Sequence, residues 1–75
     1  MHKEIIIAVR RDNLDRIIQF KTNNNNIYNY EMAKEAISKG IIENAKILQG
    51  KDTLMHVVEK NSNNIAKAFE KMEEF

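Results

Sequence analysis

The 75-residue chain predicts a small α+β domain with one four-stranded, mainly antiparallel sheet, one central helix and a short C-terminal helix. Four short runs rich in β-branched residues are joined in two pairs by polar turns, which is typical of two hairpins. Between the pairs and again at the C-terminus, apolar residues recur at helical spacing. The expected order is therefore β-β-α-β-β-α within a single domain 1–75, in which residues 1–60 form a ββαββ core.

The first hairpin is predicted from residues 4–11 and 16–22, which flank the turn 12–15. This turn is Asp-Asn-Leu-Asp, and Asn and Asp tolerate bent and left-handed backbone. With that loop Arg11 faces Arg16, and a slip in register would divide the apolar face of the hairpin. That face would carry Ile5, Ile7, Val9, Ile18 and Phe20. The other face is half polar and is expected to be covered by a helix or a second subunit; it would carry Ile6, Ala8, Arg10, Ile17, Gln19 and Lys21.

Residues 30–39 are predicted to form the central helix, after a loop at 23–26. Asn29 is a suitable N-cap, and Glu31 in the first turn complements the helix dipole. Gly40 stands where a helix end commonly requires a positive φ. The face expected to pack on the sheet carries Tyr30, Ala33, Ala36 and Ile37.

A second hairpin is predicted from residues 43–48 and 53–59, with its turn at 49–52. The side chains expected to share one face are Ala45, Ile47, Leu54, His56 and Val58. The polar run 61–64 then interrupts the chain. After it Ile65, Phe69, Met72 and Phe75 recur at helical spacing and predict an amphipathic helix within 61–75.

Size and charge exclude several classes of protein. The net charge of +1, from 12 basic and 11 acidic residues, argues against a protein that coats DNA. The N-terminal apolar run is too short for a signal peptide core or a membrane span, so we expect a cytoplasmic protein with no membrane partner. A domain of this size without disulfides is marginally stable alone, and we therefore expect self-association as a dimer or higher oligomer.

Several short motifs together resemble a known family. They are Ile-x-Ala-Val-Arg at 6–10, Glu-Ala-Ile at 35–37, Gly-Ile-Ile-Glu-Asn-Ala at 40–45 and Gly-Lys-Asp at 50–52. This pattern is similar to the small bacterial and phage proteins grouped as domain-of-unknown-function family 3892, over about residues 4–60. The resemblance implies the fold and supplies no active site, although Arg10 matches the family pattern. The chain departs from it at Leu54-Met55-His56, where such sequences tend to have an aromatic and an arginine.

The equipment for catalysis is missing from the sequence. There is no Cys, and neither Ser38 nor Ser62 has a His and an acid at motif spacing. His2 reads as part of the chain end, and with His56 it makes no metal-binding pair. Two glycines cannot build a glycine-rich phosphate loop. We expect no catalytic residue, no metal and no cofactor.

The first candidate for function is an arginine cluster, Arg10, Arg11 and Arg16. Guanidinium groups suit a fork that binds phosphate or carboxylate. In the predicted register Arg11 and Arg16 form a like-charge pair, which costs stability unless an anion or acid lies between them. Asp12 and Asp15 could supply that charge, which would make the cluster an ordinary hairpin end. Arg10 would point to the opposite face.

Aromatic and histidine side chains extend the candidate site. Tyr28 and Tyr30 could form a platform for stacking a base, or could pack at the entry of the helix. His56 could be a ligand contact or a hydrogen-bonded histidine of the core.

Together these features predict a small, non-enzymatic binding module that captures an anionic partner, such as a phosphorylated or nucleotide-like small molecule. By analogy, a chain of this size could be a phage-encoded inhibitor of host defence. An alternative is a protein-interaction module that docks through an edge strand or the C-terminal helix. A weak nucleic-acid-binding accessory protein is a further alternative, and it would show a steep salt dependence.

Overall fold

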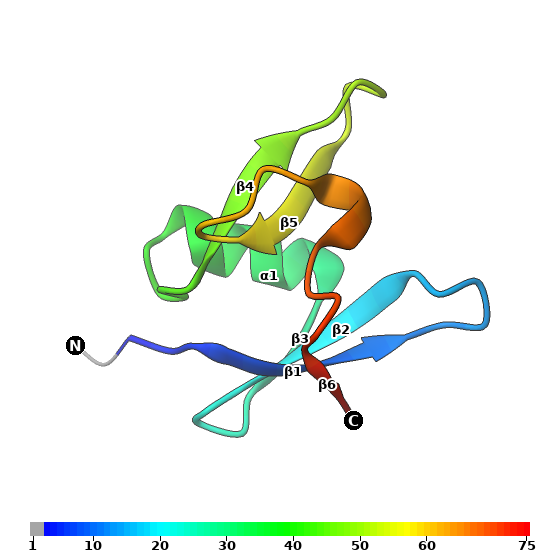
Figure 1. Cartoon of the computed structure of the whole chain (residues 1–75). Coiled ribbons are helices and arrows are strands. Elements are labelled where there is room, and N and C mark those ends of the chain that lie inside the picture. Colours follow the sequence, from blue (N-terminus) through cyan, green and yellow to red (C-terminus); the bar gives the residue numbers. More distant parts are fainter. Residues whose placement is uncertain (1–2) are drawn as a thin grey trace.

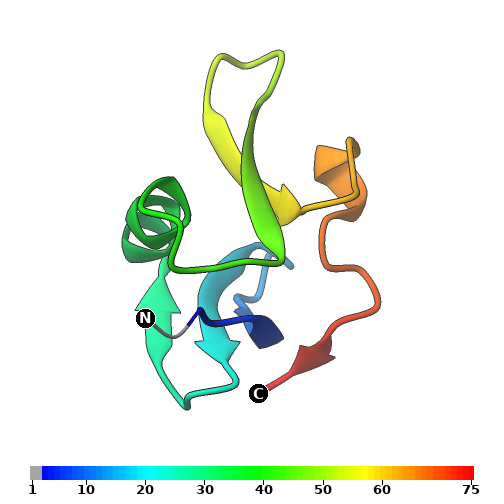
Figure 2. The same ribbon diagram turned by 90° about the vertical axis from the view of Figure 1, so that its left-hand side faces the viewer.

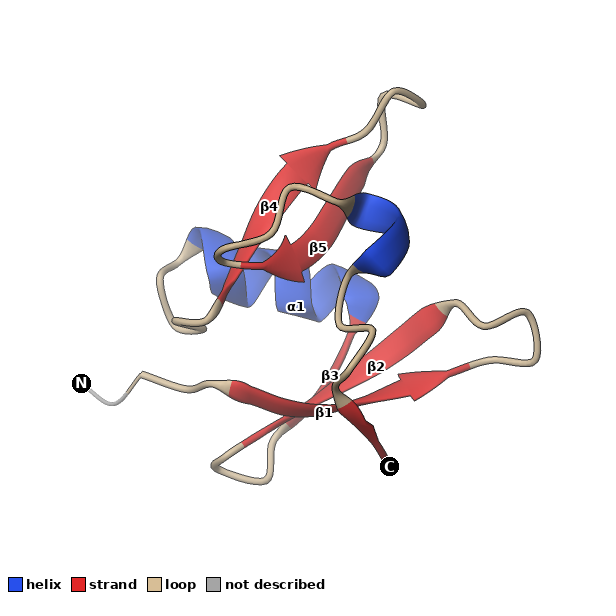
Figure 3. Ribbon diagram, viewed as in Figure 1, coloured by secondary structure: helices blue, strands red, loops and turns tan. Residues whose placement is uncertain are grey.

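The structure is a computed structural model that describes residues 3–75, so the expectation for His2 lies outside the described residues (Figure 1). The chain has an α+β fold, as expected, and residues 3–75 contain one α-helix where the sequence predicted two helices (Figure 3). The prediction of one sheet made from two hairpins is wrong. One sheet has the order β3-β2-β1-β6, and β4 and β5 form a separate two-stranded sheet. The elements are β1 Ile6–Arg11, β2 Ile17–Thr22, β3 Ile27–Asn29, α1 Tyr30–Ser38, β4 Ala45–Gln49, β5 Met55–Glu59, the 3₁₀ turn η1 Ile65–Lys67 and β6 Glu73–Glu74.

The hairpin β4–β5 lies over the four-stranded sheet, between α1 on one side and η1 on the other (Figure 2). Val57 and Val58 are both buried, although successive strand residues point to opposite faces. Cover from α1 on one face and the C-terminal part of the chain on the other explains this. The core continues down to Phe20, whose ring lies 5.5 Å from that of Phe69.

Strand β1 is paired along both of its edges. Antiparallel β2 occupies one edge. On the other edge Glu4 forms a parallel bridge with Ile42, and the Asn44 side chain then accepts a hydrogen bond from the Ile6 amide at 2.9 Å and donates to the Ile6 carbonyl at 3.0 Å. The main chain leaves β1 at this point, which keeps β4 out of the first sheet. The rest of the edge is filled by β6, which pairs with β1 in parallel.

Two bulges in the first hairpin change the predicted faces. Ile7 is the extra residue in β1 and Ile18 is the extra residue in β2, at the two places where the register shifts. Both were predicted to be in the core, and both are 40% exposed. An extra residue reverses the alternation of side chains, so Ile6 is buried in place of Ile7. Ile5, also predicted for the core, is exposed.

The second hairpin also differs in register from the prediction. Ile47 pairs with Val57, and Leu48 pairs with His56. Ile47 and His56 therefore lie on opposite faces, whereas the sequence predicted one shared face. The cause is the loop: Gly50 and Leu54 already bond to one another across it, which leaves three loop residues in place of four and shifts the partner of every strand residue.

The helix matches its prediction closely. The Asn29 side chain accepts a hydrogen bond from the Met32 amide at 2.8 Å, as an N-cap should. Ala33 and Ala36 are buried against the sheet. Gly40 has φ 77°, and the Ile41 amide donates to the Ala36 carbonyl at 2.9 Å, which closes the helix C-terminus as a Schellman motif. No helix among residues 3–75 is long and apolar enough to cross a membrane.

The predicted C-terminal helix does not form. Residues 65–75, which we call the C-terminal segment, contain η1, an irregular stretch and β6. The apolar residues of the predicted stripe still face the protein: Phe69 is buried, and Ile65 and Met72 pack against the core. A short isolated helix is marginal in water, whereas the open edge of β1 offers backbone partners to the last residues.

Three hairpin loops share one backbone conformation. In each loop the amide of the first residue donates a hydrogen bond to the carbonyl of the fifth, and the amide of the fourth residue donates to the carbonyl of the first. The fourth residue has φ 63° at Asp15, 62° at Asn25 and 64° at Thr53. This is the three-residue hairpin loop built on a type I turn and a left-handed residue. Glycine is the usual choice there, and a β-branched Thr is the least suited of the three.

Thr53→Gly should therefore stabilise the protein. The left-handed conformation costs about 1–2 kcal/mol for a residue with a side chain, and the greater freedom of Gly in the unfolded chain offsets about 0.4–1 kcal/mol of that. We expect a net gain of about 0.5–1 kcal/mol in the free energy of unfolding, measured by urea denaturation. Gly40→Ala is the matched control, because a Cβ there meets no atom and φ alone should destabilise the protein. A loss of stability in Thr53→Gly would contradict this account.

Candidate functional site

One cavity of about 480 Å³ lies where four parts of the chain meet. Its walls come from the end of the hairpin β1–β2, the start of α1, strand β5 and the C-terminal segment. A volume of this order is usual for small-molecule sites. Of the six residues that the sequence singled out, four line this cavity: Arg11, Arg16, Tyr30 and His56.

Arg10 and Tyr28 lie elsewhere. The Arg10 Nε donates to the Phe75 carbonyl at 3.2 Å, and its guanidinium lies 5.2 Å from the centroid of the Phe75 ring. The Tyr28 hydroxyl donates to the buried carboxylate of Glu4 at 2.8 Å. Tyr28 and Tyr30 thus have different partners, in an arrangement suited to packing at the start of the helix.

The predicted pairing of Arg11 with Arg16 is wrong, because Arg11 pairs with Ile17 across the bulge. Arg16 instead turns back to Asp12, and its Nε and Nη2 both lie 2.9 Å from Asp12 Oδ2. The pKa of the Asp12 carboxyl is lowered by the Arg16 backbone amide first, and then by the Leu14 amide and the Arg16 side chain. Arg16 is therefore neutralised within its own loop, as one of the two sequence-based readings expected.

Arg11 is held between two segments of the chain. Its Nη2 donates to the Phe69 carbonyl at 3.1 Å, and its Nη1 donates to the Asp15 carbonyl at 3.3 Å. The Asp15 carboxylate is 3.8 Å from Arg11 Nε, a loose ion pair. Guanidinium has five N–H donors, so donors of Arg11 remain for a ligand in the cavity.

Lys34 is a member of the site that sequence reasoning missed. Its Nζ lies 3.0 Å from Glu31 and 6.0 Å from the centroid of the Tyr30 ring. All three residues line the cavity. The signal was present in the sequence, because residues three and four apart on a helix lie on one face.

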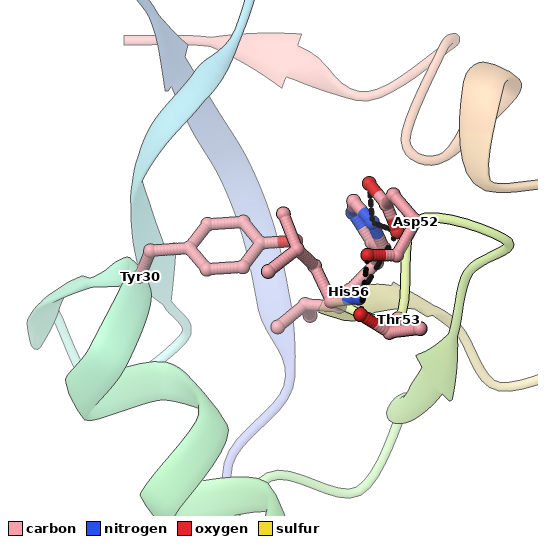
Figure 4. Close-up of polar contacts among 6 residues, drawn as sticks. Tyr30, Asp52, Thr53 and His56 are labelled. Atoms are coloured by element: carbon pink, nitrogen blue, oxygen red, sulfur yellow. Dashed lines mark hydrogen bonds and ion pairs between the residues drawn. The ribbon is translucent and has the colours of Figure 1, made fainter.

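Figure 4 shows Tyr30 reaching from α1 toward β5 and His56 lying beside Asp52. The Tyr30 hydroxyl accepts a hydrogen bond from the Val57 amide at 2.7 Å. It donates no hydrogen bond to any group within residues 3–75. His56 Nε2 lies 3.2 Å and 3.3 Å from the two Asp52 oxygens. The pKa of Asp52 is lowered, by the Leu54 amide first and then by His56.

Gly50 makes room for the pair of Asp52 and His56. A Cβ at this position would lie 2.7 Å from Asp52 Oδ1 and 3.1 Å from the imidazole ring. A side chain at this position would therefore displace the Asp52 carboxylate and the imidazole from their present arrangement.

The polar side chains of the cavity differ in exposure. Arg11 is 17% exposed, Lys34 25% and His56 25%. Arg16 is 70% exposed, and the two acidic residues of the lining, Asp15 and Glu31, are 87% and 81% exposed. The least exposed members of this set are therefore hydrogen-bond donors, and Arg16 and both acidic groups lie at the rim.

Glu4 is the second residue that the sequence did not single out. Its buried carboxylate accepts hydrogen bonds from Thr22 at 2.5 Å, Asn26 at 2.8 Å and Tyr28 at 2.8 Å. The pKa of Glu4 is lowered by Thr22 first, then by Asn26 and Tyr28, against the opposing effect of burial. The pKa of Tyr28 is raised, by burial first and then by Glu4. This cluster lies outside the cavity lining and ties the start of the chain to β2 and β3.

In residues 3–75 no three His, Asp or Glu side chains lie together in a way that could hold a metal ion.

A family model described as a protein of unknown function (DUF3892) matches residues 5–67. Neither curated proteins nor solved structures gave a match to the chain.

The Glu4 cluster makes stability depend on pH. Because the folded state lowers the pKa of Glu4 below its ordinary 4.5, the stabilisation is complete above that value and is lost as the pH falls through the folded pKa. Glu4→Gln should lower the free energy of unfolding by about 1–3 kcal/mol at pH 7, and its difference from the wild type should shrink toward pH 3. Urea denaturation at several pH values measures this. The matched control is Glu43→Gln, because Glu43 is exposed and this change should leave the free energy of unfolding at pH 7 close to that of the wild type. A difference for Glu4→Gln that stays constant with pH would contradict the linkage.

Proposed function

We propose that this chain, which belongs to the family described as proteins of unknown function (DUF3892), is a small non-enzymatic module that binds an anionic ligand in the cavity beside Arg11. The ligand class is a phosphorylated or nucleotide-like small molecule. Self-association in the cytoplasm is part of the same proposal, because a domain of this size gains stability from a partner.

The observation that carries the proposal is the difference in exposure among the polar groups of the cavity. The cationic groups of Arg11 and Lys34 belong to little-exposed side chains, whereas the two acidic residues are well exposed. Water screens an exposed charge more strongly than a less exposed one. An anion in the cavity would therefore be attracted by Arg11 and Lys34 more than it is repelled by Asp15 and Glu31.

The donors also come from separate elements and converge. Arg11 belongs to β1, Tyr30 and Lys34 to α1, and His56 to β5. Three of them retain hydrogen-bonding capacity. Arg11 has donors to spare, as described above, Lys34 has three donors and one acidic partner, and the Tyr30 hydroxyl only accepts in the bond it forms. A phosphate, with several acceptor oxygens, matches a set of donors of this kind.

The apolar part of the lining favours an organic anion over a bare inorganic ion. Aliphatic side chains cover much of the wall, among them Ile17, Met55, Val57 and Ile65. Ligand sites usually combine such walls with a few placed polar groups. A nucleoside monophosphate has both parts and is the appropriate first probe.

Lys34→Ala should weaken the binding of adenosine monophosphate about tenfold or more, because it removes a charged hydrogen bond worth roughly 1.5–3 kcal/mol. Isothermal titration calorimetry at low salt gives the dissociation constants. Folding should be little affected, since the partner Glu31 is 81% exposed and an ion pair of this kind is worth at most about 1 kcal/mol.

Lys39→Ala is the matched control. Lys39 lies on the same helix, and its Nζ is 2.9 Å from Glu35 in an equivalent pair, but it does not line the cavity. Its affinity should equal that of the wild type. Equal weakening in both variants would point to non-specific attraction, and absence of binding by the wild type to any nucleotide or phosphate would remove the proposed function.

A further inference from the structure

The C-terminal segment supplies one wall of the cavity. Ile65, Ala66 and Ala68 line it, and they are more than fifty residues from Arg11 in the chain. The site is incomplete when this segment is undocked. Whatever controls docking of the segment therefore controls the site.

Phe69 is the inner anchor of the segment. Its amide donates to Glu59 Oε1 at 2.6 Å, its carbonyl accepts from Arg11, and its ring is buried against Phe20. The residue has φ 56°, an outlier for a bulky side chain. A backbone conformation of this kind persists only while its surroundings hold it. The hydrogen bonds and the buried ring of Phe69 therefore oppose release of the segment, whereas the unfavourable φ of Phe69 favours release.

The outer anchor is small. Strand β6 has two residues, Glu73 and Glu74, and beyond it the Phe75 amide donates to the Val9 carbonyl at 3.1 Å. Arg10 completes the contact through the carbonyl and the ring of Phe75. Beyond Phe69 the segment is held by only these few contacts, and such parts of a structure open locally at low cost in free energy.

From these contacts we propose that the C-terminal segment is a closing wall whose docking is coupled to ligand binding through Arg11. The inference rests on the proposed function. When the segment is docked, the Phe69 carbonyl holds the Arg11 guanidinium in the cavity. A ligand bound to Arg11 keeps the guanidinium in the same position, where it can donate its hydrogen bond to the Phe69 carbonyl. The coupling is reciprocal: the ligand stabilises the docked segment by the same factor by which docking strengthens ligand binding.

The test changes the outer anchor, which does not line the cavity. Arg10→Ala should speed hydrogen exchange at the amides of Phe69 and Phe75, and should weaken adenosine monophosphate binding about fivefold or more. In the wild type the nucleotide should slow exchange at the same amides. Phe75→Ala, which removes the ring and keeps the backbone, is a second variant with the same expected result should Arg10→Ala fold poorly.

Lys71→Ala is the matched control, because Lys71 is an exposed cation of the same segment. Its affinity and exchange rates should equal those of the wild type. Faster exchange in Arg10→Ala with unchanged affinity would overturn the coupling and leave the proposed function intact. Absence of nucleotide binding by the wild type would overturn both.

Discussion

The fold depends on strand β1 being paired along both edges. A buried backbone group without a partner costs free energy comparable to a lost hydrogen bond, so each edge of a central strand must be filled. Three different parts of the chain do this: β2 on one side, and on the other the segment at residues 41–44 followed by β6. The Asn44 amide is decisive, because it bonds to Ile6 as a peptide group would and lets the main chain turn away.

This arrangement explains where the cavity lies. Since the main chain leaves the edge of β1 at residue 44, the hairpin β4–β5 lies over the sheet (Figure 2). The cavity is lined by the ends of the two hairpins together with α1 and the C-terminal segment. The last two residues of β1 are Arg10 and Arg11. Arg10 and Arg11 are adjacent and point to opposite faces, so one holds the end of the C-terminal segment while the other reaches the cavity.

Local features were predictable from sequence, and long-range ones were not. The cap at Asn29, the positive φ at Gly40 and the buried Ala33 follow from rules that involve a few neighbouring residues. The two bulges could not be predicted, because Ile7 and Ile18 are apolar residues in apolar runs and nothing nearby distinguishes them from core residues. The helix predicted at the C-terminus was wrong for a related reason. Its apolar residues do recur at helical spacing, but the open edge of β1, more than sixty residues away in sequence, determines the conformation of the last residues.

For the site, residue chemistry was a better guide than register. Arg11, Arg16, Tyr30 and His56 were chosen because of what guanidinium, phenol and imidazole groups can bind, and they do come together. The mutual geometry expected for the arginines was wrong, since it depended on the register. Lys34 was overlooked because its pairing with Glu31 looks like any solvated helix pair until the neighbouring hairpin is in place.

The C-terminal pairing has a consequence for the order of events in folding. The two hairpins close through short loops and form on the microsecond scale, whereas Arg10 and the Phe75 carbonyl are 65 residues apart in sequence, and contacts of this separation form slowly. The cavity is therefore assembled last. We therefore expect the contacts of the C-terminal segment to form after the two hairpins have closed.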